Sequence, residues 1–165
     1  MNLNHPISPG ISRRVLFFLL LFGSFHSLSA QKKYIKEYSG LADSLQQVYG
    51  IPSSVILGVA IIESASGTSR NSRLLHNHFG IMGKNNLLKT KGVKSRYKQY
   101  PDSKSSYIDF CRIISKRKFY SKLKGNMDYK LWIHAISRSN YSEVPDIWKE
   151  RVLTAIRKHK LSTYK

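Results

Sequence analysis

The sequence predicts a mainly helical α+β domain with a small irregular lobe in its middle. Apolar residues recur at helical spacing in five separate segments, and a stretch rich in Gly, Ser and Asn interrupts them. The 165 residues, 41% of them hydrophobic, suffice for one packed domain and are too few for two full-sized ones. The formal charge of +19 is spread along the chain, so we expect it on a folded surface and not in a disordered basic tail.

The first thirty residues have the pattern of a secretory signal. Arg13 and Arg14 precede an eight-residue apolar run, and small residues then lead to polar ones near residue 31. The run is far shorter than the roughly 20 residues of a membrane-spanning helix, so we expect cleavage and no stable membrane insertion afterwards. We therefore expect 1–30 to be a signal peptide and 31–165 to be the domain. Losing Arg13 and Arg14 lowers the formal charge from +19 to +17.

The first two predicted helices differ in their apolar pattern. From Lys32, apolar residues at helical spacing continue until Gly50 and Pro52 punctuate the chain, which predicts an amphipathic helix. Pro52, a residue suited to the first turn of a helix, opens a segment over 53–64 whose centre is apolar on every side. That pattern predicts a buried helix, followed by a Gly-, Ser- and Asn-rich stretch to residue 86.

The second half of the chain predicts an extended region and three further helices. Residues 87–100 have the pattern of a short extended or hairpin region. Asp102 or Ser103 can cap a helix that runs to about Arg117. Apolar residues at helical spacing predict the last two helices, over 129–136 and 147–156. The loop between them lies over 140–145.

Glu63 is the residue that most clearly suggests chemistry. It is the only acidic residue between Asp43 and Asp102, at the C-terminal end of the most apolar predicted helix. Burial and the negative end of the helix dipole both raise a carboxyl pKa there. A raised pKa lets a carboxylic acid keep its proton near neutral pH, so Glu63 is a candidate general acid. The alternative is an exposed Glu63, solvated or paired with Arg70.

Other polar groups support weaker hypotheses. His76 and His78 are two residues apart, but no third ligand set stands nearby, so we expect no metal and no cofactor. Cys111 lies among apolar neighbours, which favours a buried cysteine over a nucleophile. The basic and tyrosine residues over 84–100 could bind single-stranded nucleic acid, but an exported protein rarely meets it, and we expect no nucleic-acid partner.

Two segments, one after the other along the chain, resemble a known family. They are Ile61-Ile62-Glu63-Ser64-Ala65-Ser66-Gly67-Thr68-Ser69 and His76-Asn77-His78-Phe79-Gly80-Ile81. The resemblance is to glycoside hydrolase family 73, bacterial cell-wall endo-β-N-acetylglucosaminidases that include the flagellar rod-associated peptidoglycan hydrolase and autolysins. Its members have Glu-Ser-Gly-Trp-Gly-Thr-Ser, then Asn-Asn-Leu-Phe-Gly-Ile. Two later segments are also similar, Tyr97-Lys98-Gln99-Tyr100 and Asn140-Tyr141-Ser142-Glu143-Val144-Pro145, and the resemblance covers about 34–161.

The resemblance implies a lysozyme-like domain with a small, reduced central lobe. Glu63 matches the family's catalytic acid, and Tyr141 matches a tyrosine that lines the cleft and is implicated in catalysis. Asn77 and Phe79 match the segment that shapes the cleft floor, where Asn can bind an N-acetyl group and Phe can support a sugar face. Ser64 and His78, in the same matched segments, are expected to contact substrate as well.

This chain departs from the family pattern at two places. Ala65 and Ser66 stand where the family has Gly and Trp, which removes an aromatic surface that could stack on a sugar. The central lobe over 84–98 contains no acid, whereas many members place a second Glu or Asp there. A glycosidase that uses two carboxyls needs this second group as nucleophile or base.

Three explanations for the missing carboxylate remain open. The substrate's N-acetyl oxygen could attack the anomeric carbon, with Tyr141 and Asn77 positioning it, and this is the explanation we favour. Alternatively, Glu143 or Asp146 could activate water. In the third explanation catalysis is lost and the basic cleft only binds glycan.

The expected function is hydrolysis of peptidoglycan at β-1,4 bonds after N-acetylglucosamine, without a cofactor. We expect a secreted or periplasmic monomer that acts on glycan strands and is drawn to the anionic cell envelope by its charge. One alternative is a wall-binding or assembly module with little or no turnover. Another is a lytic transglycosylase, which also needs one acid but leaves anhydro-muramyl ends.

Overall fold

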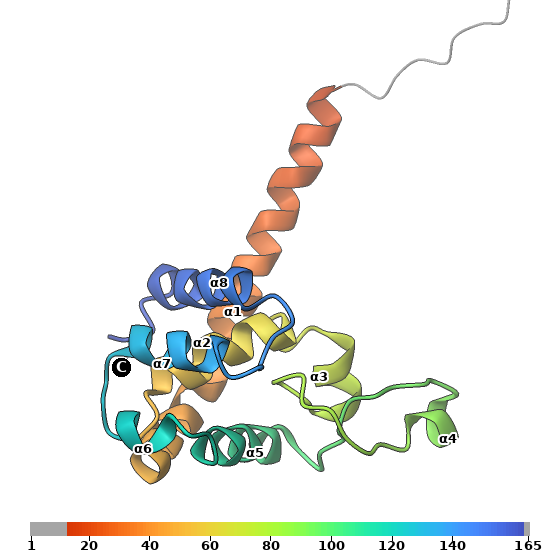
Figure 1. Cartoon of the computed structure of the whole chain (residues 1–165). Helices are drawn as coiled ribbons and strands as arrows, with labels where there is room; N and C mark the ends of the chain where they lie inside the picture. Colours follow the sequence, from red (N-terminus) through yellow and green to blue (C-terminus); the bar gives the residue numbers. More distant parts are fainter. Residues whose placement is uncertain (1–12, 164–165) are drawn as a thin grey trace, which may run out of the picture.

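The computed structural model describes the backbone over 13–163 and the side chains over 29–163. Within that range the chain is mainly helical, as predicted, and extended pairing is limited to one isolated antiparallel bridge between Met82 and Tyr97 (Figure 1). The helices, in chain order, are α1 (Arg13–Tyr49), α2 (Ser53–Ser64), α3 (Arg70–Leu75), α4 (Leu87–Lys91), α5 (Ser103–Ser115), α6 (Tyr120–Leu123), α7 (Tyr129–Ser137) and α8 (Pro145–Lys158).

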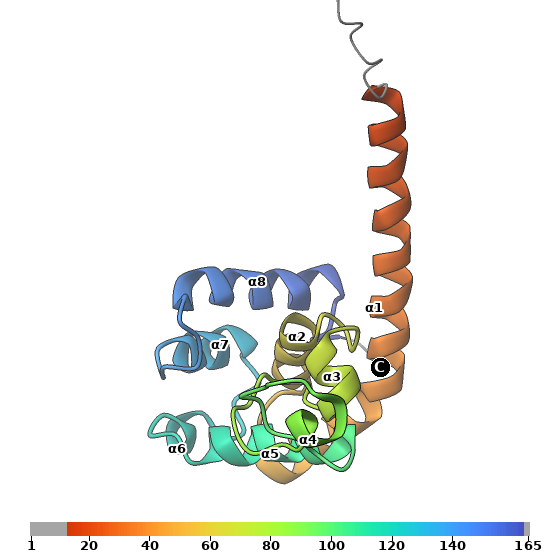
Figure 2. The same cartoon turned by 90° about the vertical axis from the view of Figure 1, so that its right-hand side faces the viewer.

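Helix α1 begins earlier than the predicted helix. It starts at Arg13 instead of Lys32, and its N-terminal part projects away from the other helices while its C-terminal part packs against α2 and α5 (Figures 1 and 2). Residues 1–12 of the expected signal peptide lie outside the described residues. In the described part of the chain, no helix has the length and apolarity needed to cross a membrane.

Helix α2 is the centre of the core and has the predicted bounds. Every residue from Ser54 to Ile61 is buried, because α1 covers one side of the helix and α8 covers another. Gly58 allows the close approach of α8, since a Cβ at this position would lie 2.6 Å from Ile156 Cγ1. This packing sets α8 beside the end of α2 that carries Glu63.

The turn after Glu63 ends α2 with three consecutive left-handed residues. Ala65, Ser66 and Gly67 have φ angles of 49°, 55° and 78°. The Ser66 N–H donates to the Ile61 carbonyl at 3.0 Å, and the Gly67 N–H donates to Ser64 Oγ at 2.8 Å. A Cβ at position 67 would lie 3.0 Å from the Tyr34 ring. Glycine is therefore needed at Gly67 both for its backbone angle and for space.

The central lobe differs from the sequence expectation. The expected extended or hairpin region over 87–100 is wrong for 87–91, which form α4 and end at Gly92. Only the later part is extended, where Gly83 N–H donates to the Arg96 carbonyl at 3.0 Å and Lys98 N–H donates to the Ile81 carbonyl at 2.8 Å. The short helix α3 also occupies part of the Gly-, Ser- and Asn-rich stretch, which is expected to be irregular.

The last four helices agree with the sequence in all but their ends and one short element. Asp102 caps α5 as predicted, and its Oδ1 accepts from the Ser105 N–H at 2.7 Å. Helix α6 is a single turn without a sequence prediction. Helix α8 begins at Pro145, two residues before its predicted start, with proline in its first turn.

Candidate active site

A cleft of about 710 Å³ opens where α2 ends. Three parts of the chain line it: Glu63, the region over 80–97, and the loop over 140–145 that leads into α8. From the region over 80–97, Arg96 and Tyr97 belong to the central lobe, and Gly80 and Met82 come just before it. Helix α2 holds the acid on the core of the domain, and the two other segments form the sides. The cleft therefore brings together residues more than 70 positions apart in the sequence.

The Glu63 carboxyl is partly buried and held at one oxygen. Trp148 Nε1 donates a hydrogen bond to Glu63 Oε1 at 2.7 Å. The other oxygen, Oε2, lies toward Gly80, 3.2 Å from the position that a Cβ would occupy there. Burial raises the Glu63 pKa, while the Trp148 hydrogen bond and the charge of Arg151 oppose that rise. In the described structure Glu63 forms no ion pair with Arg70, so the alternative of a paired surface glutamate is wrong.

Trp148 is a site residue that sequence reasoning missed. Its apolar spacing on the last helix indicated only a core position, and the side chain is 5% exposed. A buried indole N–H needs an acceptor, and Glu63 supplies it from a segment 85 residues away. This need for an acceptor indicates that a buried tryptophan has a polar contact, but a single sequence does not say which residue provides the acceptor.

Tyr141 lies in the cleft beside Trp148. The two ring centroids are 5.2 Å apart, and the Tyr141 hydroxyl donates to the Phe79 carbonyl at 3.0 Å. Burial and the nearby Glu63 carboxylate both raise the Tyr141 pKa well above its ordinary value. The phenol therefore stays neutral, and its ring is fixed against the indole that holds the acid.

The structure separates the two candidate second acids. Glu143 lines the cleft with Glu63. Asp146 does not line it and lies exposed on α8, with its Oδ1 at 3.4 Å from both Arg138 Nη2 and Lys149 Nζ. Of the pair, only Glu143 faces the space where a substrate would bind.

Asn77 and Phe79 lie beneath the cleft and do not line it. Asn77 is 1% exposed, and its Nδ2 donates to the carbonyls of Ile81 and Lys98, both at 2.8 Å. Its Oδ1 accepts from the Ile81 N–H at 3.1 Å. The expectation that Asn77 binds an N-acetyl group is therefore wrong, because the backbone uses both ends of its amide. Phe79 is buried and stacks on Phe110 with a centroid distance of 4.3 Å, so it supports the floor from below.

Ser64 and His78 belong to a buried polar network behind the cleft. Tyr34 OH lies 2.7 Å from His78 Nδ1 and 2.8 Å from Tyr107 OH, and His78 Nε2 lies 2.9 Å from Ser103 Oγ. Ser64 Oγ lies 3.3 Å from Tyr34 OH and 2.6 Å from the Ala60 carbonyl. Neither Ser64 nor His78 lines the cleft, which corrects the expectation of direct substrate contact. Burial lowers the His78 pKa to about 4.

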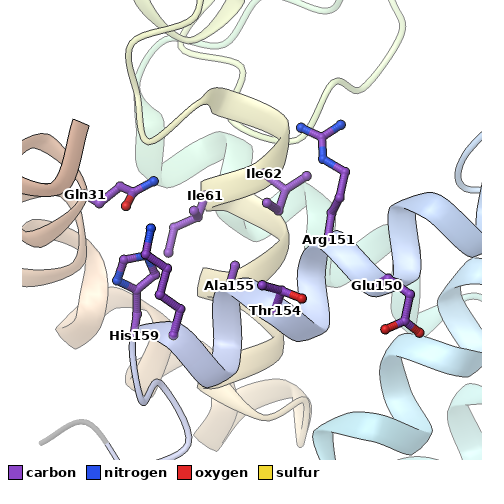
Figure 3. Close-up of a pocket in the computed structure, with 9 residues that line it drawn as sticks. Gln31, Ile61, Ile62, Glu150, Arg151, Thr154, Ala155 and His159 are labelled. Atoms are coloured by element: carbon purple, nitrogen blue, oxygen red, sulfur yellow. The ribbon is translucent and has the colours of Figure 1, made fainter. Parts of the chain in front are cut away.

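A second cavity, of about 340 Å³, lies behind the acid between α1, α2 and α8. Figure 3 shows Arg151 of α8 extended near Ile62, the residue before Glu63. Among the described residues no group of three or more His, Cys, Asp or Glu side chains could hold a metal ion. Burial raises the Cys111 pKa to about 12, which leaves this thiol unreactive at neutral pH.

Comparison with known proteins places the chain in one family and one fold. The family model described as mannosyl-glycoprotein endo-beta-N-acetylglucosaminidase matches residues 39–161. No curated protein sequence matches the chain.

Three solved structures with a similar fold are an N-acetylmuramoyl-L-alanine amidase, an autolysin and a peptidoglycan hydrolase. The amidase, from Staphylococcus aureus, is 22% identical, with a TM-score of 0.68 over 81% of this chain and 43% of that one. The catalytic domain of the autolysin Auto from Listeria monocytogenes is 21% identical, with a TM-score of 0.67 over 96% of this chain and 100% of that one. The hydrolase, from Sphingomonas sp. A1, is 18% identical, with a TM-score of 0.63 over 78% and 89%. The chain thus spans less than half of the amidase and most of the other two.

Proposed function

The chain belongs to the glucosaminidase family of glycoside hydrolases, and from this we propose that it hydrolyses peptidoglycan at β-1,4 bonds after N-acetylglucosamine. The observation that carries the proposal is the Glu63 carboxyl in the cleft, held at Oε1 by Trp148 and shifted by burial toward its protonated form. The names of two similar structures, an autolysin and a peptidoglycan hydrolase, support the choice of substrate.

In the proposed mechanism Glu63 is the general acid. The Trp148 N–H can only donate, and the better acceptor in a protonated carboxyl is its carbonyl oxygen. Oε1 is therefore the carbonyl oxygen, and the proton lies on Oε2, the oxygen on the side of Gly80. Transfer of this proton to the glycosidic oxygen makes the departing sugar a neutral alcohol.

The second group in the mechanism is the substrate's own N-acetyl oxygen, which attacks the anomeric carbon as the glycosidic bond breaks. Water then attacks the same carbon, gives its proton to the Glu63 carboxylate and restores the N-acetyl group. Tyr141 lines the cleft, and its ring packs against Trp148, the residue that holds Glu63. Its O–H donates to the Phe79 carbonyl, so its hydroxyl oxygen is the atom that positions this group, as acceptor of the acetamido N–H. Asn77 has no part in positioning the N-acetyl group, because its amide holds the backbone at Ile81 and Lys98. Glu143 is the alternative base for a water molecule, because it lines the same cleft.

Three variants and a modified glycan distinguish these two mechanisms. If the N-acetyl group attacks, Glu143→Gln and the outlying Asp146→Asn keep most activity, Tyr141→Phe loses activity, and glycan without N-acetyl groups resists cleavage. If Glu143 activates water, Glu143→Gln alone approaches the loss of Glu63→Gln. Turnover of one wall preparation by all variants measures the difference.

We also propose that the protein acts in the cell envelope after residues 1–30 are removed. The N-terminal pattern supports export, and the remaining charge of +17 favours an anionic polymer as the surface it binds. The described helices α2 to α8 and the packed end of α1 lie after residue 30, so this removal leaves the cleft intact.

Mass spectrometry of the soluble products from purified sacculi tests the proposed activity. A reducing N-acetylglucosamine end is the expected result. An anhydro-muramyl end would instead assign lytic transglycosylase activity. Bound protein without any soluble product would indicate a wall-binding module.

A further inference from the structure

One side of the cleft presents Arg96 and Tyr97 on a backbone that is held from both sides. The Arg96 carbonyl accepts from the Gly83 N–H at 3.0 Å, and Tyr97 pairs with Met82. Asn85 Nδ2 donates to the carbonyls before and after Arg96, those of Ser95 at 2.9 Å and Tyr97 at 2.8 Å. Arg96 therefore extends from a fixed segment and not from a loose loop.

The Arg96 guanidinium is exposed and has no acidic partner in the described structure. Its Cζ lies 5.8 Å from the centroid of the Tyr97 ring, and none of the ion pairs among the described residues includes it. Lys98, two residues later, is paired with Asp109 at 2.6 Å. Of the described lysine and arginine side chains, Arg96 is the one that lines the cleft, where the other charged groups are Glu63 and Glu143.

A lone guanidinium in a glycan cleft fits a carboxylate. Arginine binds a carboxylate through two parallel N–H···O bonds, and stacking on an aromatic ring orients its plane. Polymers of N-acetylglucosamine alone have no carboxylate. Peptidoglycan has two sources of one: the lactyl group of its N-acetylmuramic acid where the peptide is absent, and the peptide itself where it is present.

We propose that Arg96 binds a carboxylate of the lactyl or peptide substituent and so makes the cleft selective for peptidoglycan over uncharged N-acetylglucosamine polymers. This rests on the proposed function, because it assigns the part of the substrate that the same cleft recognises. Tyr97 and the exposed Met82 beside it provide apolar surface for the sugar rings, while Arg96 binds the carboxylate of the charged substituent.

Binding measurements on an inactive background test the assignment. Isothermal titration of Glu63→Gln is compared with Glu63→Gln/Arg96→Ala for three soluble ligands of equal glycan length: peptide-bearing glycan, peptide-free glycan with free lactyl groups, and an N-acetylglucosamine oligomer. Loss of a charged hydrogen bond predicts a Kd about tenfold or more weaker for at least one acidic ligand. The Kd for the uncharged oligomer stays unchanged.

Lys94→Ala is the matched control, because it removes the same charge from an exposed residue that does not line the cleft. It should weaken all acidic ligands only slightly. A loss confined to peptide-bearing glycan identifies the peptide carboxylate, and a loss on peptide-free glycan identifies the lactyl group.

Equal loss on all three ligands, loss on none, or no binding of either acidic ligand before substitution overturns the proposal. The proposed function is judged separately, by whether wild-type protein releases soluble products from sacculi. If the wild-type protein releases no soluble products, the proposed function fails, but the binding measurements still test the role of Arg96.

Discussion

Glu63 combines a hydrogen bond that favours its carboxylate with burial that favours its protonated form. Burial is the larger influence, so its pKa is raised although Trp148 donates to it and Arg151 lies near. The net result suits a group that must carry a proton into the reaction and lose it there. Trp148 limits the rise in pKa and fixes the direction of the carboxyl.

Trp148→Phe should change both the rate and its pH dependence. The substitution keeps an aromatic ring against Tyr141 but removes the N–H that lowers the Glu63 pKa. Because activity needs protonated Glu63, the loss of kcat/KM at high pH should move to higher pH, and the maximal rate should fall about 10- to 100-fold as the carboxyl loses its orientation. A pH–rate profile measures both effects, and an unchanged profile would contradict the role of Trp148.

The sequence predicted the Glu63 environment but not its partners. An acid at the end of an all-apolar helix must be partly buried, and that inference needs only local residues. The Trp148 contact depends on how α8 crosses α2, which is set by the space at Gly58. The hydrogen bonds of Asn77 to the backbone were also not predictable from the sequence, because Lys98, one of its two acceptors, lies 21 residues away.

The turn over 65–67 stores backbone strain next to the acid. Ala65 is exposed with a φ of 49°, a conformation that costs an L-residue about 1–2 kcal/mol. Ala65→Gly should therefore stabilise the protein by about 1 kcal/mol and raise its Tm by a few °C. Thermal unfolding measures the change.

Ala135→Gly is the control for this substitution, since Ala135 lies within α7. There glycine should destabilise by roughly 0.5–1 kcal/mol. A loss of stability in both variants would show that the strain at Ala65 is too small to matter.

The network around His78 ties α1, α5 and the loop after α3 together and requires a neutral imidazole. Burial lowers its pKa from 6.5 to about 4, so the unfolded chain binds more protons between these values. Stability should be complete above about pH 6.5 and fall progressively as the pH drops toward 4. His78→Gln should cost about 1–3 kcal/mol at neutral pH and lose this part of the acid sensitivity.

Urea unfolding of wild type, His78→Gln and His134→Gln at several pH values checks this account. His134 is exposed on α7, so its substitution should leave both stability and its pH dependence near those of wild type. Identical acid sensitivity in wild type and His78→Gln would contradict the account.

Long helices were predictable, and short ones were not. The apolar run of α2 and the Asp102 cap of α5 determine those elements locally, and their predicted positions are confirmed. Helices α4 and α6 have five and four residues, too few to show a period of 3.6 in the sequence. Packing and backbone hydrogen bonds from distant segments decide such short pieces.

At the scale of the whole molecule, the positive charge should govern attachment to an anionic wall. Binding to purified sacculi should weaken as salt rises from about 0.1 M to 1 M, because the Debye length falls from about 10 Å to about 3 Å. Binding of an uncharged N-acetylglucosamine oligomer should change little over the same range. Pelleting of sacculi with bound protein measures the first and titration the second, and salt-independent wall binding would mean that charge is not what attaches the protein.

Digestion of purified sacculi by Glu63→Gln is the most direct test of the central claim, that this one acid drives peptidoglycan hydrolysis. The amide introduced by this substitution keeps an oxygen for the Trp148 hydrogen bond but has no acidic proton to transfer. Release of soluble products should fall on the order of 100-fold or more with an unchanged circular dichroism spectrum. Glu150→Gln, on exposed α8 surface outside the cleft, should digest as fast as wild type. Full digestion by Glu63→Gln would contradict the account.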